Sequence, residues 1–216
     1  WEARQNMLVA GLTPGKTAEL AIYTKPVARA QKISSASYDR SRQQCIEAWN
    51  TLLARGVRLQ TPEEIVNDAW RSMLIGNFMI AVGDRPNYSA QNAYAKLYEG
   101  ECGDTLRSFL LYGHLDLAKA MLRPMLEFDR HDTRFHVAGH KLQLLAFYYW
   151  TTRDAATIRA YEPLWRPALE LILSSREADS GLLPKDRYAG DIKENVYSLN
   201  SNANSWRGLH DLAAVL

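Results

Sequence analysis

Three segments of the sequence combine carboxylates with aromatic or amide side chains, and each could carry chemistry. In the first, residues 94–107, Glu99, Glu101 and Asp104 lie close together and Arg107 follows three positions after Asp104. Acids at the start of a helix also favour its dipole, and an acid three positions before an arginine can form an ion pair. Glu99 and Asp104 fit that structural role as well as a functional one. Glu101 is less easily explained as a helix cap.

A second, richer segment covers residues 181–207. Acids alternate with tyrosines and are followed by amides and a Trp-Arg pair: Asp186, Tyr188, Asp191, Glu194, Tyr197, Asn200, Asn202, Asn204, Trp206 and Arg207. Sugar rings stack on aromatic side chains, and their hydroxyls bind carboxylates and amides. Glycosidic cleavage needs one carboxyl group to protonate the leaving oxygen and another to activate water or attack. The structural alternative is that Ser201 or Asn202 caps the last helix.

Histidines mark the third segment, residues 130–140. His136 and His140 share one helical face and His131 lies just before them, which invites comparison with a zinc site. The HxxxH spacing lacks the glutamate of a zincin, so surface or capping roles are the better interpretation. We expect neither a metal nor another cofactor.

Composition excludes several classes of partner. The chain has 216 residues, with 26 Lys and Arg against 24 Asp and Glu and no block of like charge, so we expect no nucleic-acid partner. Its longest apolar stretches, such as 142–150, are too short to cross a membrane. Two cysteines, Cys45 and Cys102, form neither a metal motif nor a disulfide framework and leave the compartment open.

The pattern of residues predicts two kinds of structure along the chain. Residues 7–27 place a Pro14-Gly15 turn between short β-prone segments, with apolar alternation at Leu20 and Ile22 running on to Thr24. Residues 28–60 are interpreted as a linker and a connecting helix that Ser37 can cap. From residue 61 to residue 216 the apolar period is helical.

Helices are predicted from 61 to about 80 and at about 103–112, 115–127, 134–151, 155–175 and 201–216. Thr61 and Glu64 fit a capping box, with Pro62 at the first helical position. Short turns imply antiparallel helical hairpins. A tetratricopeptide array is disfavoured because neither its period nor its residue pattern is present.

Taken in order, these features resemble the six-hairpin glycosidases, the broad group of glucoamylase-like, rhamnosidase-like and glucosidase-like enzymes. TPGKTAELAIYTKP resembles the end of the β-sandwich that precedes their catalytic ring, and SYDRSRQQCIEAWNTLL resembles their connecting helix. GECGDTLRSFLLYGHLDLAKAML resembles the start of their first inner helix, and GLLPKDRYAGD with SNANSWRGLHDLA resembles a later acid-bearing loop and inner helix. The resemblance covers nearly the whole chain.

This resemblance implies a mainly α fold, part of an (α/α)₆ toroid over 61–216 after the last strands of a β-sandwich in 1–27. It implies a glycoside hydrolase that acts on an oligo- or polysaccharide without a cofactor. Asp191 is the best candidate for the general acid, followed by Asp186 and Glu101. The residues expected to contact substrate are Glu99, Asp104, Arg107, Tyr188, Asn204, Trp206 and Arg207.

Leu183-Pro184 departs from the glucoamylase pattern, which has Trp-Glu there, so the acid assignment stays open. Both ends of the chain look cut, and we expect the second carboxylate and the remaining hairpins to lie beyond Leu216. A chain ending there is therefore expected to be inactive alone. A secreted or periplasmic location is slightly favoured over a cytoplasmic one.

Two other functions stay open. A polysaccharide lyase on a helical toroid would use Tyr188, His136 or His140, and Arg187 to remove a proton beside a uronate, with an Asn from 200–204 neutralising the carboxylate. A carbohydrate-binding protein without catalysis would need none of the acids. The acid-rich segments favour hydrolysis over both.

Overall fold

A computed structural model describes residues 2–4, 7–9, 11–23, 26, 28, 34–90, 92–189 and 192–216. It contains two compact units, residues 1–52 and 53–216. The described residues are mainly helical, as predicted, with small two-stranded sheets. None of the helices in these ranges has both the length and the apolar composition that a membrane crossing requires.

In the first unit, β1 (Glu2–Arg4) and β2 (Met7–Val9) form an antiparallel pair. The predicted Pro14-Gly15 turn is confirmed, with Gly15 at a φ of 77°. The strand predicted around Leu20 and Ile22 is wrong for residues 16–23, which have no regular structure. Leu20 and Ile22 are 47% and 81% exposed, and a strand without a hydrogen-bonded partner is not stable. Thr24 lies outside the described residues.

The helix predicted after the linker is α1 (Ser35–Leu53). Its cap is Ser34 rather than Ser37. The Ser34 hydroxyl accepts the Ser37 N–H at 3.3 Å, and the Ser37 hydroxyl accepts the Ser34 N–H at 2.9 Å. This is the reciprocal geometry of a capping box, with serine in place of the usual glutamate. Ser37 therefore stabilises the helix start from within its first turn.

The second unit contains the remaining helices, in positions close to those predicted. They are α2 (Glu64–Ile80), α3 (Glu99–Leu111), α4 (Leu115–Glu127), the short 3₁₀ helix η1 (His131–Thr133), α5 (Arg134–Thr152), α6 (Ala155–Ala160), α7 (Glu162–Ser175) and α8 (Leu199–Ala213).

Two predicted helix boundaries are wrong for local reasons. Thr61 does not cap α2, because the Asn67 side chain binds both the N–H and the carbonyl of Thr61, at 2.8 and 3.0 Å. The single helix predicted over 155–175 is divided at Tyr161 into α6 and α7. Pro163 has no N–H group, so it cannot continue the helical hydrogen bonds across Tyr161, but it fits the first turn of a new helix.

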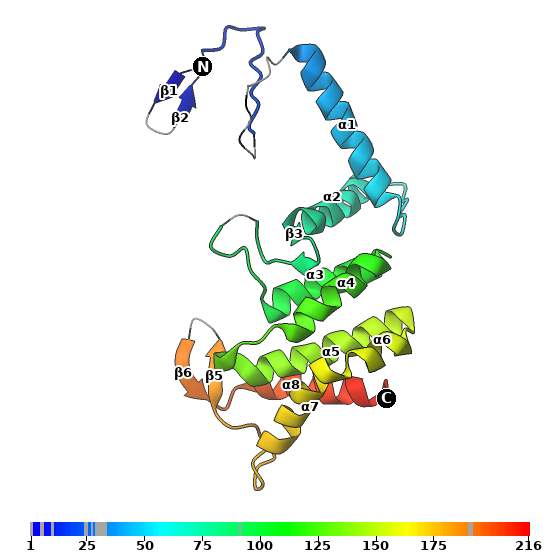
Figure 1. Ribbon diagram of the computed structural model, residues 1–216, viewed down its shortest axis with the longest axis vertical. Coiled ribbons are helices and arrows are strands. Elements are labelled where there is room, and N and C mark those ends of the chain that lie inside the picture. The colour runs from blue at the N-terminus through cyan, green and yellow to red at the C-terminus, as the bar shows by residue number, and fades with distance from the viewer. Residues whose placement is uncertain are drawn as a thin grey trace. The chain divides into compact units, whose positions relative to one another are not determined.

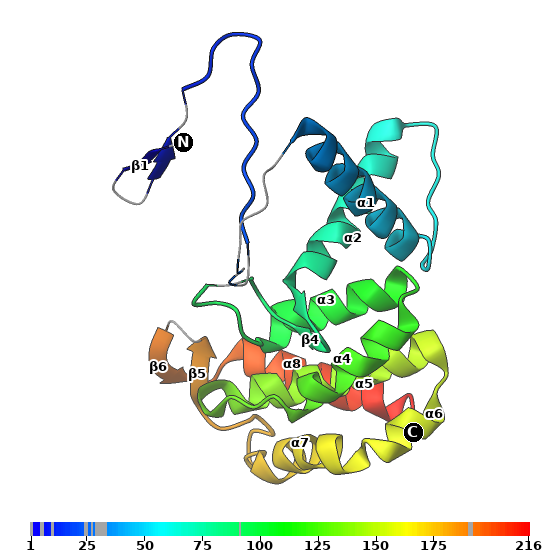
Figure 2. The ribbon, with the colours of Figure 1, turned by 45° about the horizontal axis from the view of Figure 1, so that its top comes forward.

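Successive helices alternate in direction, so α3, α5 and α8 run the same way while α4 and α7 run back (Figures 1 and 2). The central helix is α5, which contacts α3, α4, α7 and α8. It buries side chains around much of its circumference, including Phe135, Leu142, Leu145 and Tyr148. The N-terminal ends of α3, α5 and α8 therefore lie at the same end of this helical unit.

Glycines bring α5 and α8 into close contact. A Cβ added at Gly139 would lie 2.4 Å from the backbone carbonyl of Asn204, and one added at Gly208 would lie 2.5 Å from the carbonyl oxygen of Gly139. Real Cβ atoms do not approach backbone so closely, so both positions require glycine. The close crossing places the first turns of α5 and α8 side by side.

Two hairpins in the loops of this unit were not predicted. β3 (Ala81–Val82) pairs with β4 (Arg85–Pro86), and β5 (Asp186–Ala189) pairs with β6 (Ile192–Val196). A register shift lies between Arg187 and Ala189. The second hairpin stands beside the N-terminal end of α5, because β5 contacts η1 and α8.

Candidate functional site

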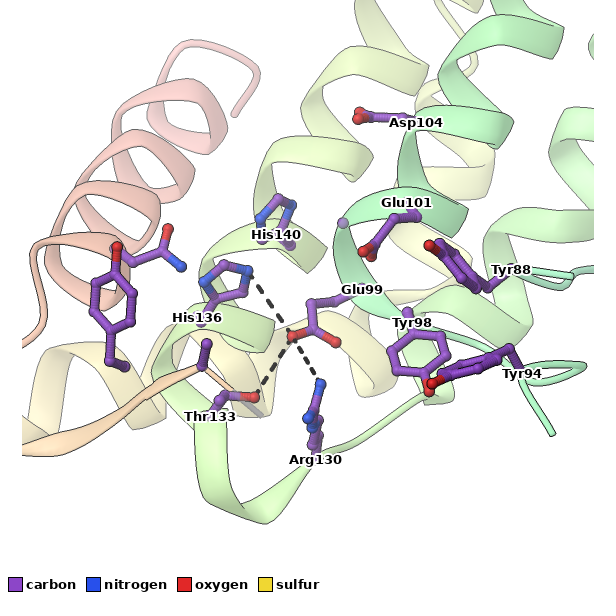
Figure 3. Close-up of a pocket in the computed structure, with 14 residues that line it drawn as sticks. Tyr88, Tyr94, Tyr98, Glu99, Glu101, Asp104, Arg130, Thr133, His136 and His140 are labelled. Carbon is purple, nitrogen blue, oxygen red and sulfur yellow. Dashed lines mark hydrogen bonds and ion pairs between the residues drawn. The ribbon is translucent and has the colours of Figure 1, made fainter. Parts of the chain in front are cut away.

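A cavity of about 530 Å³ lies at the N-terminal ends of α3, α5 and α8 (Figure 3). We call it the tyrosine cavity because four tyrosines line it: Tyr88, Tyr94, Tyr98 and Tyr188. The other polar side chains that line it are Glu99, Glu101, Asp104, Arg130, Thr133, His136, His140 and Asn200. Its size suits a small ligand.

The tyrosine rings form a partly exposed aromatic wall. Tyr88 packs against Tyr94 and Tyr98 with ring centroids 6.0 and 5.4 Å apart, both edge to face. Tyr94 is 57% exposed and Tyr188 is 48% exposed, so parts of their rings can contact a ligand. Of these four tyrosines only Tyr188 was predicted. The richness of residues 83–100 in Tyr and Asn was the signal for the other three.

Glu99 is the buried carboxylate of the cavity, with only 9% of its surface exposed. Its Oε1 lies 3.5 Å from the Thr133 hydroxyl, 3.7 Å from Arg130 Nη1 and 3.9 Å from His136 Nε2 (Figure 3). Its Oε2 is buried and, among the described residues, has no hydrogen-bond partner. Arg130 and Thr133 were not predicted as site residues. They come from the segment 130–140, whose histidines were interpreted as surface or capping residues.

Glu101 and Asp104 also line the cavity from α3, but they are exposed. Asp104 accepts a hydrogen bond from Arg107 at 3.1 Å, so the ion pair considered from the sequence is present. The Glu101 carboxylate has no hydrogen bond or ion pair within the described part of the chain. Glu101 is therefore the acid on this wall most free to contact a ligand.

His136 and His140 line the cavity from α5, with their rings tilted by 34° and their centroids 4.5 Å apart. Burial lowers the pKa of His136, although Glu99 opposes the shift. Burial, followed by the neighbouring His136 and Arg107, lowers the pKa of His140 to about 3. Both imidazoles are therefore held in their neutral form near neutral pH.

Four predicted contact residues lie away from the cavity lining. Arg107 lies further along α3, with its guanidinium 5.8 Å from the Phe147 ring centroid. Trp206 is 65% exposed and stacks on His210, and Arg207 binds both carboxylate oxygens of Asp211 at 2.7 Å. Asn204 stands behind His136, with its amide nitrogen 3.4 Å from Nδ1.

Asp186 lines a neighbouring pocket instead, together with His131, Asp132, Arg134 and Arg187. It is 8% exposed and accepts the Arg187 N–H at 2.8 Å. Burial raises its pKa, while the backbone N–H groups of Arg187 and Phe135 lower it. The cap residue of α5, Thr133, makes no side-chain capping bond. The Asp186 carboxylate lies near the first turn of α5 and can stabilise that helix start in its place, which is a structural role. Arg187 forms an ion pair with Asp132.

Asp191, the favoured general acid, lies outside the described residues. Ala189, two positions earlier in the sequence, lines the tyrosine cavity. The cap of α8 is Ser198, whose hydroxyl accepts the Ser201 N–H at 3.2 Å, so neither Ser201 nor Asn202 has that role. Asn202 instead accepts the Leu183 N–H at 2.9 Å.

No group of three or more His, Cys, Asp or Glu side chains that could hold a metal ion occurs in the residues that the structure describes. Comparison of the chain with protein-family models, curated protein sequences and solved structures found no match.

Proposed function

We propose that this chain is part of a glycoside hydrolase of the six-hairpin kind, with residues 61–216 in an (α/α)₆ toroid and residues 1–27 ending a β-sandwich. The alternation of helix direction supports this architecture, because a toroid of hairpins sets inner helices parallel to one another. The helices α3, α5 and α8 would be inner helices, and α4 and α7 outer ones.

The observation that carries the proposed activity is the composition of the tyrosine cavity. Tyrosine rings offer surfaces for the apolar faces of sugars, while Glu99, Glu101 and Asn200 offer partners for hydroxyl groups. Two carboxyl groups from one helix start thus share a cavity with aromatic side chains. This is the mixture that binding and cleavage of a neutral saccharide require.

We assign Glu101 as a catalytic carboxylate because it lines the cavity and is exposed. The general acid in this proposal is Asp191, which follows a cavity-lining strand residue, Ala189, by two positions. Glu99 is assigned to substrate binding, since Arg130, Thr133 and His136 surround one of its oxygens. Asp186 is not assigned a catalytic role.

A polysaccharide lyase is the second candidate, favoured by the neutral His136 beside Tyr188 and Asn200 in the same cavity. The charges lining the cavity argue against it. Three carboxyl groups, those of Glu99, Glu101 and Asp104, face one guanidinium, that of Arg130. An anionic uronate would be repelled by this excess, whereas a neutral sugar would not.

The test is to incubate the full-length protein, of which this chain is proposed to be part, with neutral and uronate-containing polysaccharides and aryl glycosides, measuring reducing ends and unsaturated-uronate absorbance together. Binding of neutral oligosaccharides is measured in parallel by calorimetry. Glu101→Gln and Asp191→Asn are compared with Glu127→Gln, which alters an exposed acid on α4 that pairs with Arg123.

New reducing ends without absorbance, lost in Glu101→Gln and Asp191→Asn but kept in Glu127→Gln, would support hydrolysis. Absorbance from uronates would establish the lyase instead. Binding without either product, unchanged in the acid variants, would mean a carbohydrate-binding protein. Absence of both binding and turnover across the panel would contradict the proposal.

A further inference from the structure

A chain of amide side chains links α8 and α5 behind the tyrosine cavity. Gln143 Nε2 lies 3.0 Å from the backbone carbonyl of Asn204 and 3.1 Å from its Oδ1. Asn204 Nδ2 in turn lies 2.9 Å from both the backbone carbonyl oxygen and the side-chain Oδ1 of Asn200. A backbone carbonyl can only accept, so each of these amides must turn its nitrogen toward it. The orientation of both amides is thereby fixed.

This orientation determines which nitrogen of His136 carries the proton. The Asn204 amide nitrogen, a donor only, lies 3.4 Å from His136 Nδ1. A proton on Nδ1 would point at another N–H group, so Nδ1 must be the acceptor of the ring. The proton of the neutral imidazole then lies on Nε2, which faces Glu99 Oε1 at 3.9 Å.

We infer that Asn204 is a positioning residue, which holds His136 as the Nε2–H tautomer and through it orients the carboxylate of Glu99. The Nε2–H, the Arg130 guanidinium and the Thr133 hydroxyl are all donors, and all three lie nearest the same oxygen, Oε1. The carboxylate is therefore held from one side, with Oε2 on the other.

The orientation has a consequence for the ligand, and this part rests on the proposed function. Oε2 is a buried acceptor without a partner in the described residues, which is an unfavourable state unless a donor is supplied. A hydroxyl group of a neutral sugar is such a donor, whereas a carboxylate or sulfate is not. We therefore assign Glu99 to recognition of a sugar hydroxyl.

The charged and titratable groups around His136 come from several elements. Glu99 and Glu101 on α3 and Asp186 on β5 favour its protonation, while Arg130 before η1 opposes it. His140 lies one turn further along α5. Asn204 is the group that contacts Nδ1 directly, so a change at this residue acts on Nδ1 while Glu99, Glu101, Asp186 and Arg130 stay in place.

The test is the long-range ¹H–¹⁵N spectrum of the ¹⁵N-labelled full chain near neutral pH, with the His136 signals assigned by their loss in His136→Gln. We expect a pyridine-like shift for Nδ1 and a pyrrole-like shift for Nε2. In Asn204→Asp, a carboxylate replaces the donor beside Nδ1, and Nδ1 should become protonated and pyrrole-like.

The matched control is Asn202→Asp on the same helix, which keeps the oxygen that accepts the Leu183 N–H and should leave the His136 shifts unchanged. The wild-type spectrum tests the inference even if Asn204→Asp does not fold. A protonated Nδ1 in the wild type, or unchanged shifts in a folded Asn204→Asp, would overturn it. Because no sugar is involved, this outcome is independent of whether the proposed hydrolysis is found.

Discussion

Gly208 lies directly against Gly139, so that a Cβ at Gly208 would be 2.5 Å from the Gly139 carbonyl oxygen. This contact sets the separation of α5 and α8, the helices that carry His136 and Asn204. The geometry behind Glu99 therefore depends on two residues that have no side chains. Neither of them lines the tyrosine cavity.

Gly139→Ala is expected to destabilise the protein. Its Cβ would meet the backbone of Asn204 at 2.4 Å, and backbone cannot move aside cheaply. Overpacking of this kind costs about 1–3 kcal/mol of unfolding free energy. Urea denaturation would measure the loss. Gly76→Ala is the control, because a Cβ added to that helical glycine would have nothing within 4 Å and alanine should be neutral or stabilising there. Equal effects of the two substitutions would contradict the close crossing.

Tyr94→Ala should weaken the binding of neutral oligosaccharides, whereas Tyr94→Phe should retain most of it. The ring lines the cavity and is 57% exposed, so its removal takes away a stacking surface without opening the core. Loss of one aromatic contact corresponds to a dissociation constant about three- to tenfold higher. Calorimetry measures the change. Tyr38→Ala, at an exposed tyrosine on α1, serves as the control, and an equal loss there would argue against the cavity as the binding site.

Asp154→Asn should lower stability at neutral pH, with a difference from the wild type that shrinks in acid. Asp154 accepts hydrogen bonds from Thr157, Lys119 and Tyr148, which together hold its pKa well below the usual value of 3.8. A depressed pKa contributes stability that is present above the unfolded-state value and is lost as pH falls toward the folded-state value. Urea denaturation at pH 7 and at about pH 3 checks this.

The control for Asp154 is Asp68→Asn, which removes an exposed acid that pairs with Arg71 on α2. Exposed pairs contribute little, so its effect should be small at both pH values. If Asp154→Asn loses the same free energy at both pH values, its carboxylate charge is not the source of the stability.

The two cysteines should differ sharply toward a thiol reagent. Cys45 is exposed, whereas Cys102 is buried and its pKa is raised to about 11, chiefly by burial. Since the thiolate is the reactive form, the folded protein should show one rapidly modified thiol, and the second should react only after denaturation. Cys45→Ser should abolish the rapid phase. Rapid reaction in that variant would show that the first turn of α3 opens readily.

Periodicity predicted where the helices of the second unit lie, but not the division of 155–175 into α6 and α7. α4 begins and ends where predicted, and α5 differs by one residue at its end, because their apolar spacing is strong. The β5–β6 hairpin escaped prediction because its strands are short and largely polar, and the residues of β6 are all exposed. The starts of α1 and α2 were misplaced because the side chains of Ser34 and Asn67 make local hydrogen bonds that the sequence pattern did not indicate.

Part of the site could be predicted from the sequence, at the start of α3 and on β5. Glu99, Glu101 and Tyr188 were expected and do line one cavity. Arg107 lies eight positions after Glu99, about 12 Å along the axis of α3, and so falls outside the cavity lining. Arg130 and Thr133 could not be identified as site residues from the sequence. Their contacts with Glu99 depend on how α3 and α5 pack together, and spacing along the chain does not show that packing.

The parallel course of α3, α5 and α8 gives the second unit two ends, and the two ends differ in how freely their residues can change. Every lining residue of the tyrosine cavity lies at one end, while the turns around Gly113 and Arg153, both at positive φ, lie at the other. A fluorescent label attached to the exposed side chain at position 153 should be tolerated without disturbing ligand recognition. The same separation would let selection change the ligand through one set of loops while the opposite set is conserved for folding.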